Sequence, residues 1–515
     1  MRVLIFHGYL LRGTGSNVYN ASLARALVGL GHEVHLLCQE RQARELDFVD
    51  AVGTFEDGRL EVETLREPVR LTVYLPDIHG VLPVYVADRY DGFEAVPYPD
   101  LDDSRLERYL AANVAAVEQV AARVDPDVAL ANHMVMGPVI LARGLAGRVP
   151  YAVTIHGSAL EYTVRPHPER FLPYAMEGLE GARAVLVGSR HTAESLWEVT
   201  GDPALRERTR LGPPGVDVHA FRPRPPEEAA ERLRRLADRL EGRAAASWGG
   251  EEGAAAALRS LDPASDRIVS YVGKLIVSKG VDLLLAAWPL VAARVPDARL
   301  CVVGFGTYRE GLERMLAALA ARDLDALREI AARGRELEGG PPGGLSYLAA
   351  FLDTVGEDYL AAGPEAASRV HFTGRLEHED LPDLLPACEA QVVPSTFPES
   401  FGMVAAEAAA CGALPVVAAH SGLAEVARTL GAAAPDQAVP WLTFTVGPRA
   451  VTEIADDLSA WLQAPPDLRQ ATRAAIVAAT REHYSWDGVA RSVIAAARGE
   501  LDGLPRPAPD IGANG

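Results

Sequence analysis

The only two lysines of this 515-residue chain, Lys274 and Lys279, lie five residues apart in the segment Tyr271-Val-Gly-Lys-Leu-Ile-Val-Ser-Lys-Gly280. Lysine and arginine together number 50, so the 48 other strong cations are all arginine. In such a chain, a pair of lysines indicates a place where a compact point charge is needed. An ammonium group suits a phosphate oxygen in this way, whereas arginine presents a rigid planar fork. The alternative is two ordinary lysines on a solvated surface.

A second motif combines two glutamates with the start of a helix, in Pro394-Ser-Thr-Phe-Pro-Glu399-Ser-Phe-Gly402-Met-Val-Ala-Ala-Glu407-Ala-Ala-Ala-Cys-Gly412. The free N–H groups and the dipole of a helix start attract anions, and carboxylates accept hydrogen bonds from hydroxyls. The motif therefore predicts a ligand with phosphates and hydroxyls, such as a nucleotide sugar. The alternative is a helix-start carboxylate at Glu399 and a solvent-facing Glu407. The alanines around Glu407 instead predict a buried helix, in which a glutamate needs a partner.

Short apolar strands and helices alternate twice along the chain, which predicts two doubly wound α/β domains with parallel sheets. In the first series we expect strands at 3–6, 34–38, 128–131, 151–155 and 184–187, with helices at 17–30 and 106–124. In the second series we expect strands at 268–272, 299–303, 370–373, 390–393 and 414–417, with a helix at 281–295. Ligands of such sheets lie at the carboxyl ends of the strands. Both motifs directly follow predicted strands.

Proline-rich sequence between Pro213 and Pro226 stops helices and favours extended backbone, as an interdomain connection requires. We therefore expect a first domain at 1–222, a linker and helical insertion at 223–265, and a second domain at 266–484. Within the second domain, residues from about 307 to 367 are predicted to form a helical insertion. The proline- and glycine-rich residues 503–515 are predicted to form a disordered tail.

Composition excludes several classes of protein. The net charge of −20 argues against a nucleic-acid surface and does not favour peripheral contact with anionic membranes. No apolar stretch reaches eighteen residues, and the N-terminus lacks the features of a signal peptide. The four scattered cysteines predict a reduced, cytoplasmic protein without a disulfide framework or zinc site.

The combined motifs resemble the retaining glycosyltransferases of family 4, which have the GT-B fold: two Rossmann-like domains that face each other across a cleft. The resemblance rests on the Gly-Lys-x4-Lys-Gly loop and the Glu-x7-Glu spacing. Further matches occur in the same order at Gly31-His-Glu-Val34, Thr154-Ile-His156-Gly157, Gly215-Val-Asp217, Phe221-Arg-Pro223, and Ser421-Gly422 with Glu425. It covers nearly the whole chain except 223–265 and 307–367. It also implies that a helix at 485–502 packs back on the first domain.

The resemblance implies a role for each matching residue. Lys274 and Lys279 would hold the donor diphosphate, although the family usually has arginine at the position of Lys274. Glu399 would bind hydroxyls of the transferred sugar, Glu407 would accept the ribose hydroxyls, and His156 would lie near the sugar. Taken alone, a histidine at a strand end before glycine, as His156 is, is more often a hydrogen-bonded turn residue than a functional one. The other residues implied in donor binding are Gly15, Gly273, Phe401, Gly402, Met403 and Val404. Gly15 belongs to the loop 13–16, which lacks the usual pair of glycines.

The predicted function is transfer of a hexose-type sugar from a nucleoside diphosphate donor to a hydroxyl acceptor, with retention and by front-face attack. The two lysines make a metal unnecessary, so no metal site and no cofactor are expected. Uridine, guanosine and adenosine remain open as the donor base, and a small molecule, a glycan or a lipid-linked sugar remains open as the acceptor. The rival readings are a nucleotide-sugar epimerase, a pyridoxal phosphate-dependent phosphorylase and a non-catalytic sensor of nucleotide sugars. A phosphorylase needs a lysine for its Schiff base, and both lysines are assigned to the phosphate loop.

Overall fold

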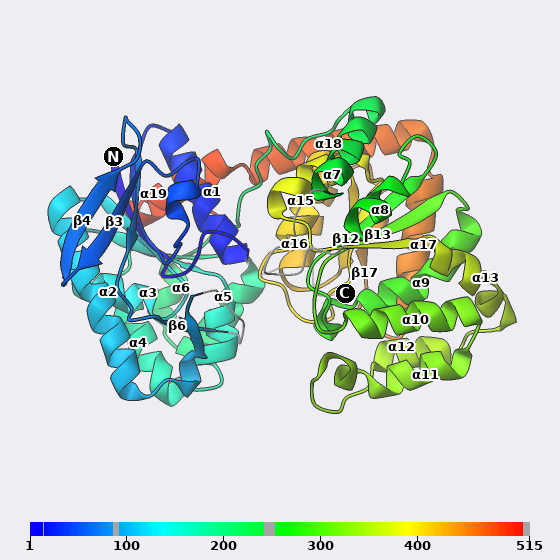
Figure 1. Ribbon diagram of the computed structural model, residues 1–515, viewed down its shortest axis with the longest axis horizontal. Coiled ribbons are helices and arrows are strands. Elements are labelled where there is room, and N and C mark those ends of the chain that lie inside the picture. The colour runs from blue at the N-terminus through cyan, green and yellow to red at the C-terminus, as the bar shows by residue number, and fades with distance from the viewer. Residues whose placement is uncertain (14, 86–91, 242–252, 508–515) are drawn as a thin grey trace. The chain divides into compact units, whose positions relative to one another are not determined.

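The computed structural model describes residues 1–13, 15–85, 92–241 and 253–507 (Figure 1). The chain forms two compact units, one made of Met1–Gly215 with Trp486–Gly515 and the other of Val216–Ser485. Each unit is built on its own mostly parallel sheet. The predicted class, two Rossmann-like α/β domains, is confirmed.

Among the described residues, the sheet of the first unit has nine strands. They are β1 (Arg2–Phe6), β2 (Glu33–Leu37), β3 (Ala51–Glu56), β4 (Arg59–Thr64), β5 (Leu71–Leu75), β8 (Val128–Asn132), β9 (Tyr151–Ile155), β10 (Ala184–Val187) and β11 (Thr209–Leu211). Their order is β11-β10-β9-β8-β1-β2-β5-β3-β4, and all neighbours are parallel except the hairpin β3–β4. The order runs outward in both directions from β1, so the switch point lies between β1 and β8. A separate pair is formed by β6 (Val81–Val84) and β7 (Glu94–Pro97).

Both faces of the central strands β1, β2, β5, β8, β9 and β10 are buried, which explains why these strands are continuous apolar runs, whereas the edge strand β4 is largely exposed. Side chains alternate between the faces of a strand. In β1, Val3 and Ile5 belong to one hydrophobic cluster, and Leu4 and Phe6 to another. The helices are α1 (Gly15–Gly29), α2 (Asp103–Val124), α3 (Gly137–Leu145), α4 (Pro168–Glu180), α5 (Arg190–Thr200), α6 (Pro203–Arg208) and α19 (Trp486–Arg498).

The sheet of the second unit has six parallel strands. They are β12 (Arg267–Val272), β13 (Ala298–Val303), β14 (Val370–Gly374), β15 (Ala390–Val393), β16 (Leu414–Ala418) and β17 (Thr443–Phe444). Their order is β14-β13-β12-β15-β16-β17, and every pair is parallel. Numbered along the chain, this is the 3-2-1-4-5-6 order of dinucleotide-binding folds, whose ligands bind where the order reverses. The switch point lies between β12 and β15, the two strands that precede the lysine and glutamate motifs.

Helices cover this second sheet and form one continuous core with it. They are α7 (Pro226–Glu241), α8 (Ala254–Arg259), α9 (Val281–Arg294), α10 (Arg309–Ala321), α11 (Leu324–Arg333), α12 (Ser346–Leu352), α13 (Glu357–Ser368), α14 (Leu381–Leu384), α15 (Met403–Cys411), α16 (Ser421–Gly431), α17 (Ala450–Gln463) and α18 (Pro466–His483). The predicted insertion at 307–367 corresponds to α10–α13 and to the short 3-10 helix η5 (Arg335–Glu338).

The division between the units falls at Gly215, earlier than the predicted boundary at 222. The predicted linker at 223–265 contributes Leu233, Leu236 and Leu258 to the core of the second unit, so its described part is structural rather than a free connection. Residues 242–252 of this segment lie outside the described residues. The boundary falls earlier than predicted because Val216 and Phe221 are also buried in the core of the second unit.

The C-terminal end of the chain belongs to the first unit. Helix α19 contributes Val489 and Val493 to the cluster that contains Val3 and Ile5. Leu504 is buried, and the carbonyl oxygen of Pro505 accepts a hydrogen bond from the N–H of Leu211 at 2.8 Å. The prediction of a disordered tail therefore does not hold for residues 503–507, and residues 508–515 lie outside the described part of the chain.

Candidate active site

The lysine loop, defined as residues 273–280, joins β12 to α9 at the carboxyl end of the sheet. Within it, Val277–Lys279 form the single 3-10 turn η4, and Gly280 follows with φ 66°. A Cβ at Gly280 would lie 2.0 Å from the carbonyl oxygen of Pro394, so only glycine fits there. This close approach brings the lysine loop against the end of β15.

The glutamate loop, defined as residues 394–402, is joined to the lysine loop by hydrogen bonds. The N–H of Thr396 donates to the carbonyl oxygen of Ser278 at 2.9 Å. The ammonium of Lys279 pairs with Oε1 of Glu399. The structure therefore brings together two predicted site residues that lie 120 residues apart in the chain.

Glu399 is held by both its side chain and its backbone. The hydroxyl of Ser395 donates to Oε1 of Glu399 at 2.6 Å. The N–H of Glu399 donates to Oγ of Ser421 at 2.9 Å, and its carbonyl accepts from the N–H of Gly422 at 2.9 Å. The side chains of Lys279 and Glu399 are 30% and 22% exposed. A partly exposed ion pair of this kind can exchange partners with a charged ligand.

Helix α15 begins directly after the glutamate loop and presents its N-terminus beside the Lys279–Glu399 pair. Gly402 has φ 104°, and a Cβ there would lie 2.4 Å from Cδ2 of Leu423. Met403 and Val404 form the first turn, and N–H groups at that position have no partner within a helix. Phe401 is buried with its ring 5.1 Å from that of Tyr484. The arrangement fits the predicted anion site.

Glu407 is buried in α15 and finds its partner outside the helix. Nε2 of His378, in the segment after β14, lies 2.7 Å from Oε1 of Glu407, whose side chain is 3% exposed. Burial lowers the pKa of His378, but the charge and the hydrogen bond of Glu407 outweigh it and raise the pKa above its usual value. A solvent-facing Glu407 is thereby excluded.

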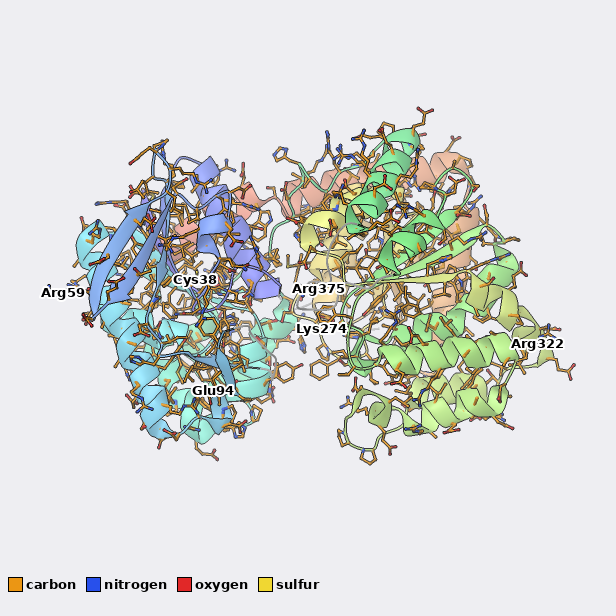
Figure 2. All side chains as sticks on the ribbon, in the orientation of Figure 1. Cys38, Arg59, Glu94, Lys274, Arg322 and Arg375 are labelled. Carbon is orange, nitrogen blue, oxygen red and sulfur yellow. The ribbon has the colours of Figure 1, made fainter. Side chains whose placement is uncertain are left out.

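Two further cations lie in the loops at this edge of the second unit. The carbonyl oxygen of Lys274 accepts a hydrogen bond from the hydroxyl of Tyr271 at 2.8 Å. The guanidinium of Arg375, after β14, lies 5.4 Å from the ring centroid of Phe305 and 3.1 Å from the carboxylate of Glu377. Figure 2 shows Lys274 and Arg375 in one region of this unit, with Arg322 at its opposite end.

The helical insertion touches the lysine loop through Glu338. Oε2 of Glu338 accepts a hydrogen bond from the N–H of Val277 at 2.7 Å. Nearby, burial raises the pKa of Asp282 to about 7, and the charge of Glu338 contributes in the same direction. At the strand ends, the N–H of Leu275 donates to the carbonyl of Phe305 at 2.7 Å, and a Cβ at Gly304 would lie 1.9 Å from the carbonyl oxygen of Gly273. The helical insertion and the loop after β13 therefore both contact the lysine loop.

In the first unit, His156 belongs to a chain of hydrogen bonds at the carboxyl ends of β1, β8 and β9. Nε2 of His156 lies 2.7 Å from Oδ1 of Asn132, and Asn132 exchanges two hydrogen bonds with Asn20. Nδ2 of Asn20 lies 3.0 Å from Nδ1 of His7, whose Nε2 lies 2.9 Å from Oδ1 of Asn17.

These contacts indicate the tautomer of His156. Nδ2 of Asn132 donates to the carbonyl oxygen of Phe6, so Oδ1 is the acceptor and Nε2 of His156 carries the hydrogen. Burial, and next the charge of His7, lower the pKa of His156 to about 3. Burial likewise lowers the pKa of His7 to about 4, although its hydrogen bond to Asn17 opposes this. His156 is therefore a neutral imidazole that can hydrogen-bond to a hydroxyl but holds a proton poorly.

Gly15 is the first residue of α1, and no described atom lies within 4 Å of a Cβ placed there. Close packing therefore does not require glycine at this position. Thr14, in the same predicted loop, lies outside the described residues. The donor-binding role of Gly15 stays a prediction, as do the roles of the other site residues.

Sequence reasoning missed several polar residues near the strand ends of both units. They are His378, Arg375, His420 and Glu338 in the second unit, and Asn132 in the first. The buried Glu407 signalled that a partner was needed, and a histidine in a loop after a parallel strand was a candidate for it. Nothing local in the sequence marks the other four.

Among the described residues, no group of three or more histidine, cysteine, aspartate or glutamate side chains could hold a metal ion. A membrane-spanning helix would need a longer apolar run than any helix in the described ranges contains.

Two family models match the chain, one for each unit. "Glycosyltransferase Family 4" matches residues 13–220, and "Glycosyl transferases group 1" matches residues 356–477. The chain belongs to glycosyltransferase family 4. This confirms the family predicted from the sequence. The lysine loop and most of the insertion lie between the two matched segments of this family 4 protein.

The relatives of this family 4 protein include two proteins named D-inositol 3-phosphate glycosyltransferase. The one from Mycobacterium sp. (strain JLS) is 28% identical over 344 residues, which cover 65% of this chain and 61% of the relative. The one from Mycolicibacterium vanbaalenii is 28% identical over 397 residues, which cover 73% of this chain and 74% of the relative. The first match thus spans about three fifths of its relative's length.

Solved structures establish the GT-B fold. Sucrose-phosphate synthase from Thermosynechococcus elongatus has a TM-score of 0.57 at 19% identity and covers 96% of this chain and 98% of its own. The Anabaena protein HepE, in complex with UDP and glucose, has a TM-score of 0.55 at 16% identity and covers 96% of this chain and 98% of its own. The predicted GT-B fold is confirmed.

Proposed function

We propose that this family 4 protein transfers a hexose-type sugar from a nucleoside diphosphate sugar to a hydroxyl group of an acceptor, with retention of anomeric configuration. The observation that carries the proposal is the Lys279–Glu399 pair beside the start of α15, at the switch point of the second sheet. It combines a cation and free N–H groups for phosphates with a carboxylate for hydroxyls.

In this proposal the donor binds to the second unit. Lys274, Lys279 and the N–H groups of Met403 and Val404 hold the diphosphate, and Gly273, Phe401 and Gly402 shape the loops around it. Glu399 binds hydroxyls of the sugar. Glu407, oriented by its contact with His378, accepts hydrogen bonds from the ribose hydroxyls.

Breaking the bond between the sugar and the diphosphate places negative charge on the leaving oxygen. Lys279 and the N-terminus of α15 are fixed before the reaction, because the backbone bonds between the two loops position them. Preorganised charges of this kind need little rearrangement when the charge develops, and they are often the largest single contribution to catalysis.

Retention fits front-face attack, in which the leaving phosphate oxygen takes the proton of the acceptor hydroxyl. Glu399 is not assigned as a nucleophile in this proposal, because its carboxylate binds hydroxyls of the sugar and Ser395 holds its Oε1. His156 is poorly suited to act as a general base, because burial depresses its pKa to about 3. We propose that it hydrogen-bonds to a substrate hydroxyl as a neutral ring.

The names of similar proteins narrow the choice of donor and acceptor to test first. HepE was solved with UDP and glucose, which favours UDP-glucose as the first donor to test. The relatives named D-inositol 3-phosphate glycosyltransferase favour an acceptor rich in hydroxyls, such as a cyclitol or a sugar. We further propose that the reaction is independent of metal and cofactor, since the lysines supply the positive charge. A cytoplasmic location is consistent with four buried cysteines that form no disulfide.

The proposal is tested by thermal unfolding with UDP-, GDP- and ADP-sugars, followed by transfer assays with the sugar that stabilises most. A ligand present at 100 times its dissociation constant stabilises by about 2.7 kcal/mol, which is easily seen as a shift in Tm. We expect one base to stabilise the protein and sugar transfer to proceed in the presence of EDTA. Stabilisation by none of them would refute the proposal. Conversion of the donor without an acceptor would indicate an epimerase, and binding without any turnover would indicate a sensor.

A further inference from the structure

The segment after β16 holds the glutamate loop in an unusual way. Ser421, the first residue of α16, has φ 52°. This left-handed conformation is unfavourable for a residue with a Cβ, and non-glycine residues adopt it mainly where surrounding interactions compensate. The side chain of the N-cap residue His420 makes no capping hydrogen bond to α16. The polar atoms of His420 and Ser421 therefore serve something other than their own helix.

The hydrogen bonds of His420 and Ser421 form a chain that ends at the backbone N–H of Glu399. Nε2 of His420 lies 2.8 Å from the carbonyl oxygen of Ser395. A carbonyl only accepts, so Nε2 carries the hydrogen. In the neutral ring Nδ1 then accepts from the hydroxyl of Ser421 at 3.0 Å. This leaves a lone pair of the same hydroxyl oxygen to accept the N–H of Glu399 at 2.9 Å.

The same segment also fixes Glu399 through its other atoms. The N–H of Gly422 donates to the carbonyl of Glu399 at 2.9 Å. A Cβ at Gly422 would lie 2.5 Å from Cα of Phe401, so the start of α16 packs directly on the glutamate loop. Ser395, whose carbonyl oxygen accepts a hydrogen bond from His420, donates through its hydroxyl to the carboxylate of Glu399. Backbone and side chain of Glu399 are thus held by one connected network.

We propose that His420 and Ser421 are positioning residues that orient Glu399 toward the sugar of the donor, an inference that rests on the proposed function. They act through Glu399 and do not themselves contact the diphosphate. Glycine would suit φ 52° better, but it has no hydroxyl to accept the N–H of Glu399. This hydrogen bond explains why serine occupies the strained position. Replacing His420 or Ser421 should therefore leave binding of the diphosphate unchanged.

The test is the variant Ser421→Gly, which removes the hydroxyl and relieves the backbone. The control is Arg322→Gly, at an exposed residue with φ 57° at the end of α10, far from the lysine loop (Figure 2). Both variants should keep or raise Tm, since glycine suits these conformations. Calorimetric titration of each with UDP and with UDP-glucose, or with the matching GDP or ADP pair if that base binds the wild type, separates the two parts of the donor.

We expect Ser421→Gly to bind UDP as the wild type does. Its affinity for UDP-glucose should fall roughly tenfold and its kcat by a similar factor, as expected for the loss of one hydrogen bond that positions Glu399. His420→Leu should show the same selective loss, and Arg322→Gly should show none. Wild-type affinity of Ser421→Gly for the sugar nucleotide would overturn the inference. Equal losses for UDP and UDP-glucose would also overturn it, because they indicate general support of the loop. If the wild type binds no nucleoside diphosphate, the proposed function itself fails.

Discussion

Replacing Lys279 with alanine removes the ammonium that pairs with Glu399 beside the start of α15. In the proposed reaction this cation meets the negative charge that develops on the leaving diphosphate. Loss of one fixed group of this kind lowers kcat about 10²–10³-fold, equivalent to about 2.7–4 kcal/mol of transition-state stabilisation. We expect a decrease of that size in steady-state sugar transfer at saturating donor and acceptor.

Folding should survive the substitution. The side chains of the pair are 30% and 22% exposed, and partly exposed ion pairs contribute only about 0–1 kcal/mol to stability. Ser395 still donates to Glu399, so the carboxylate keeps a partner. A change of this size moves Tm by about 4 °C or less in a domain of this size. Thermal unfolding of the variant therefore distinguishes lost chemistry from lost structure.

Two further variants sharpen the experiment. Arg328→Ala removes an exposed cation on α11. The guanidinium of Arg328 lies 3.8 Å from the carboxylate of Asp325, and its removal should leave kcat unchanged. Glu399→Gln combined with Lys279→Ala forms a double-mutant cycle, and residues that act on the same donor should give non-additive losses. A kcat for Lys279→Ala within about threefold of wild type, far below the loss expected for such a group, would refute the role of the lysine loop.

Three pH-dependent predictions follow from buried groups. Glu407→Gln should lower the pKa of His378 in an NMR titration. Because the raised pKa stabilises the fold at acidic pH and this contribution is lost as pH rises through the folded-state pKa, urea unfolding should show a larger wild-type advantage near about pH 6 than near about pH 9. His7 and His156 are held neutral with pKa values of about 4 and about 3, so the unfolded chain binds more protons below about pH 6.5. Stability should fall as pH is lowered from there, and His7→Gln should reduce that slope; an unchanged slope would contradict the assignment. Burial raises the pKa of Asp282 to about 7, so its protonated form is favoured in the fold and stability is lost as pH rises from about 4 to about 7. Asp282→Asn should therefore raise Tm near about pH 8 and have little effect near about pH 5; a lower Tm at both pH values would contradict this reading.

The parts of the site that could be predicted are those encoded within one stretch of chain. Apolar runs of β12 and β15 predicted parallel strands, and the residues that follow each strand lie at the carboxyl edge because all strands of this sheet run in one direction. Lysine spacing and the glycine at the start of α15 are likewise local signals. The boundary at Gly215 and the packed residues 503–507 were not predicted, because burial of side chains such as Phe221 and Leu504 depends on surfaces formed elsewhere in the chain.

The sequence by itself determined the two α/β units and the two loops that contain most of the proposed donor-site residues. Only the tertiary structure decided which side chains meet: Lys279 with Glu399, His378 with Glu407, and His156 with Asn132. Strand and helix periodicity is a property of neighbouring residues, and so it can be read along the chain. A hydrogen bond or an ion pair between residues far apart in the chain depends on the register and packing of whole sheets. For the same reason, the strained Ser421 becomes informative only when the N–H of Glu399 is seen beside it.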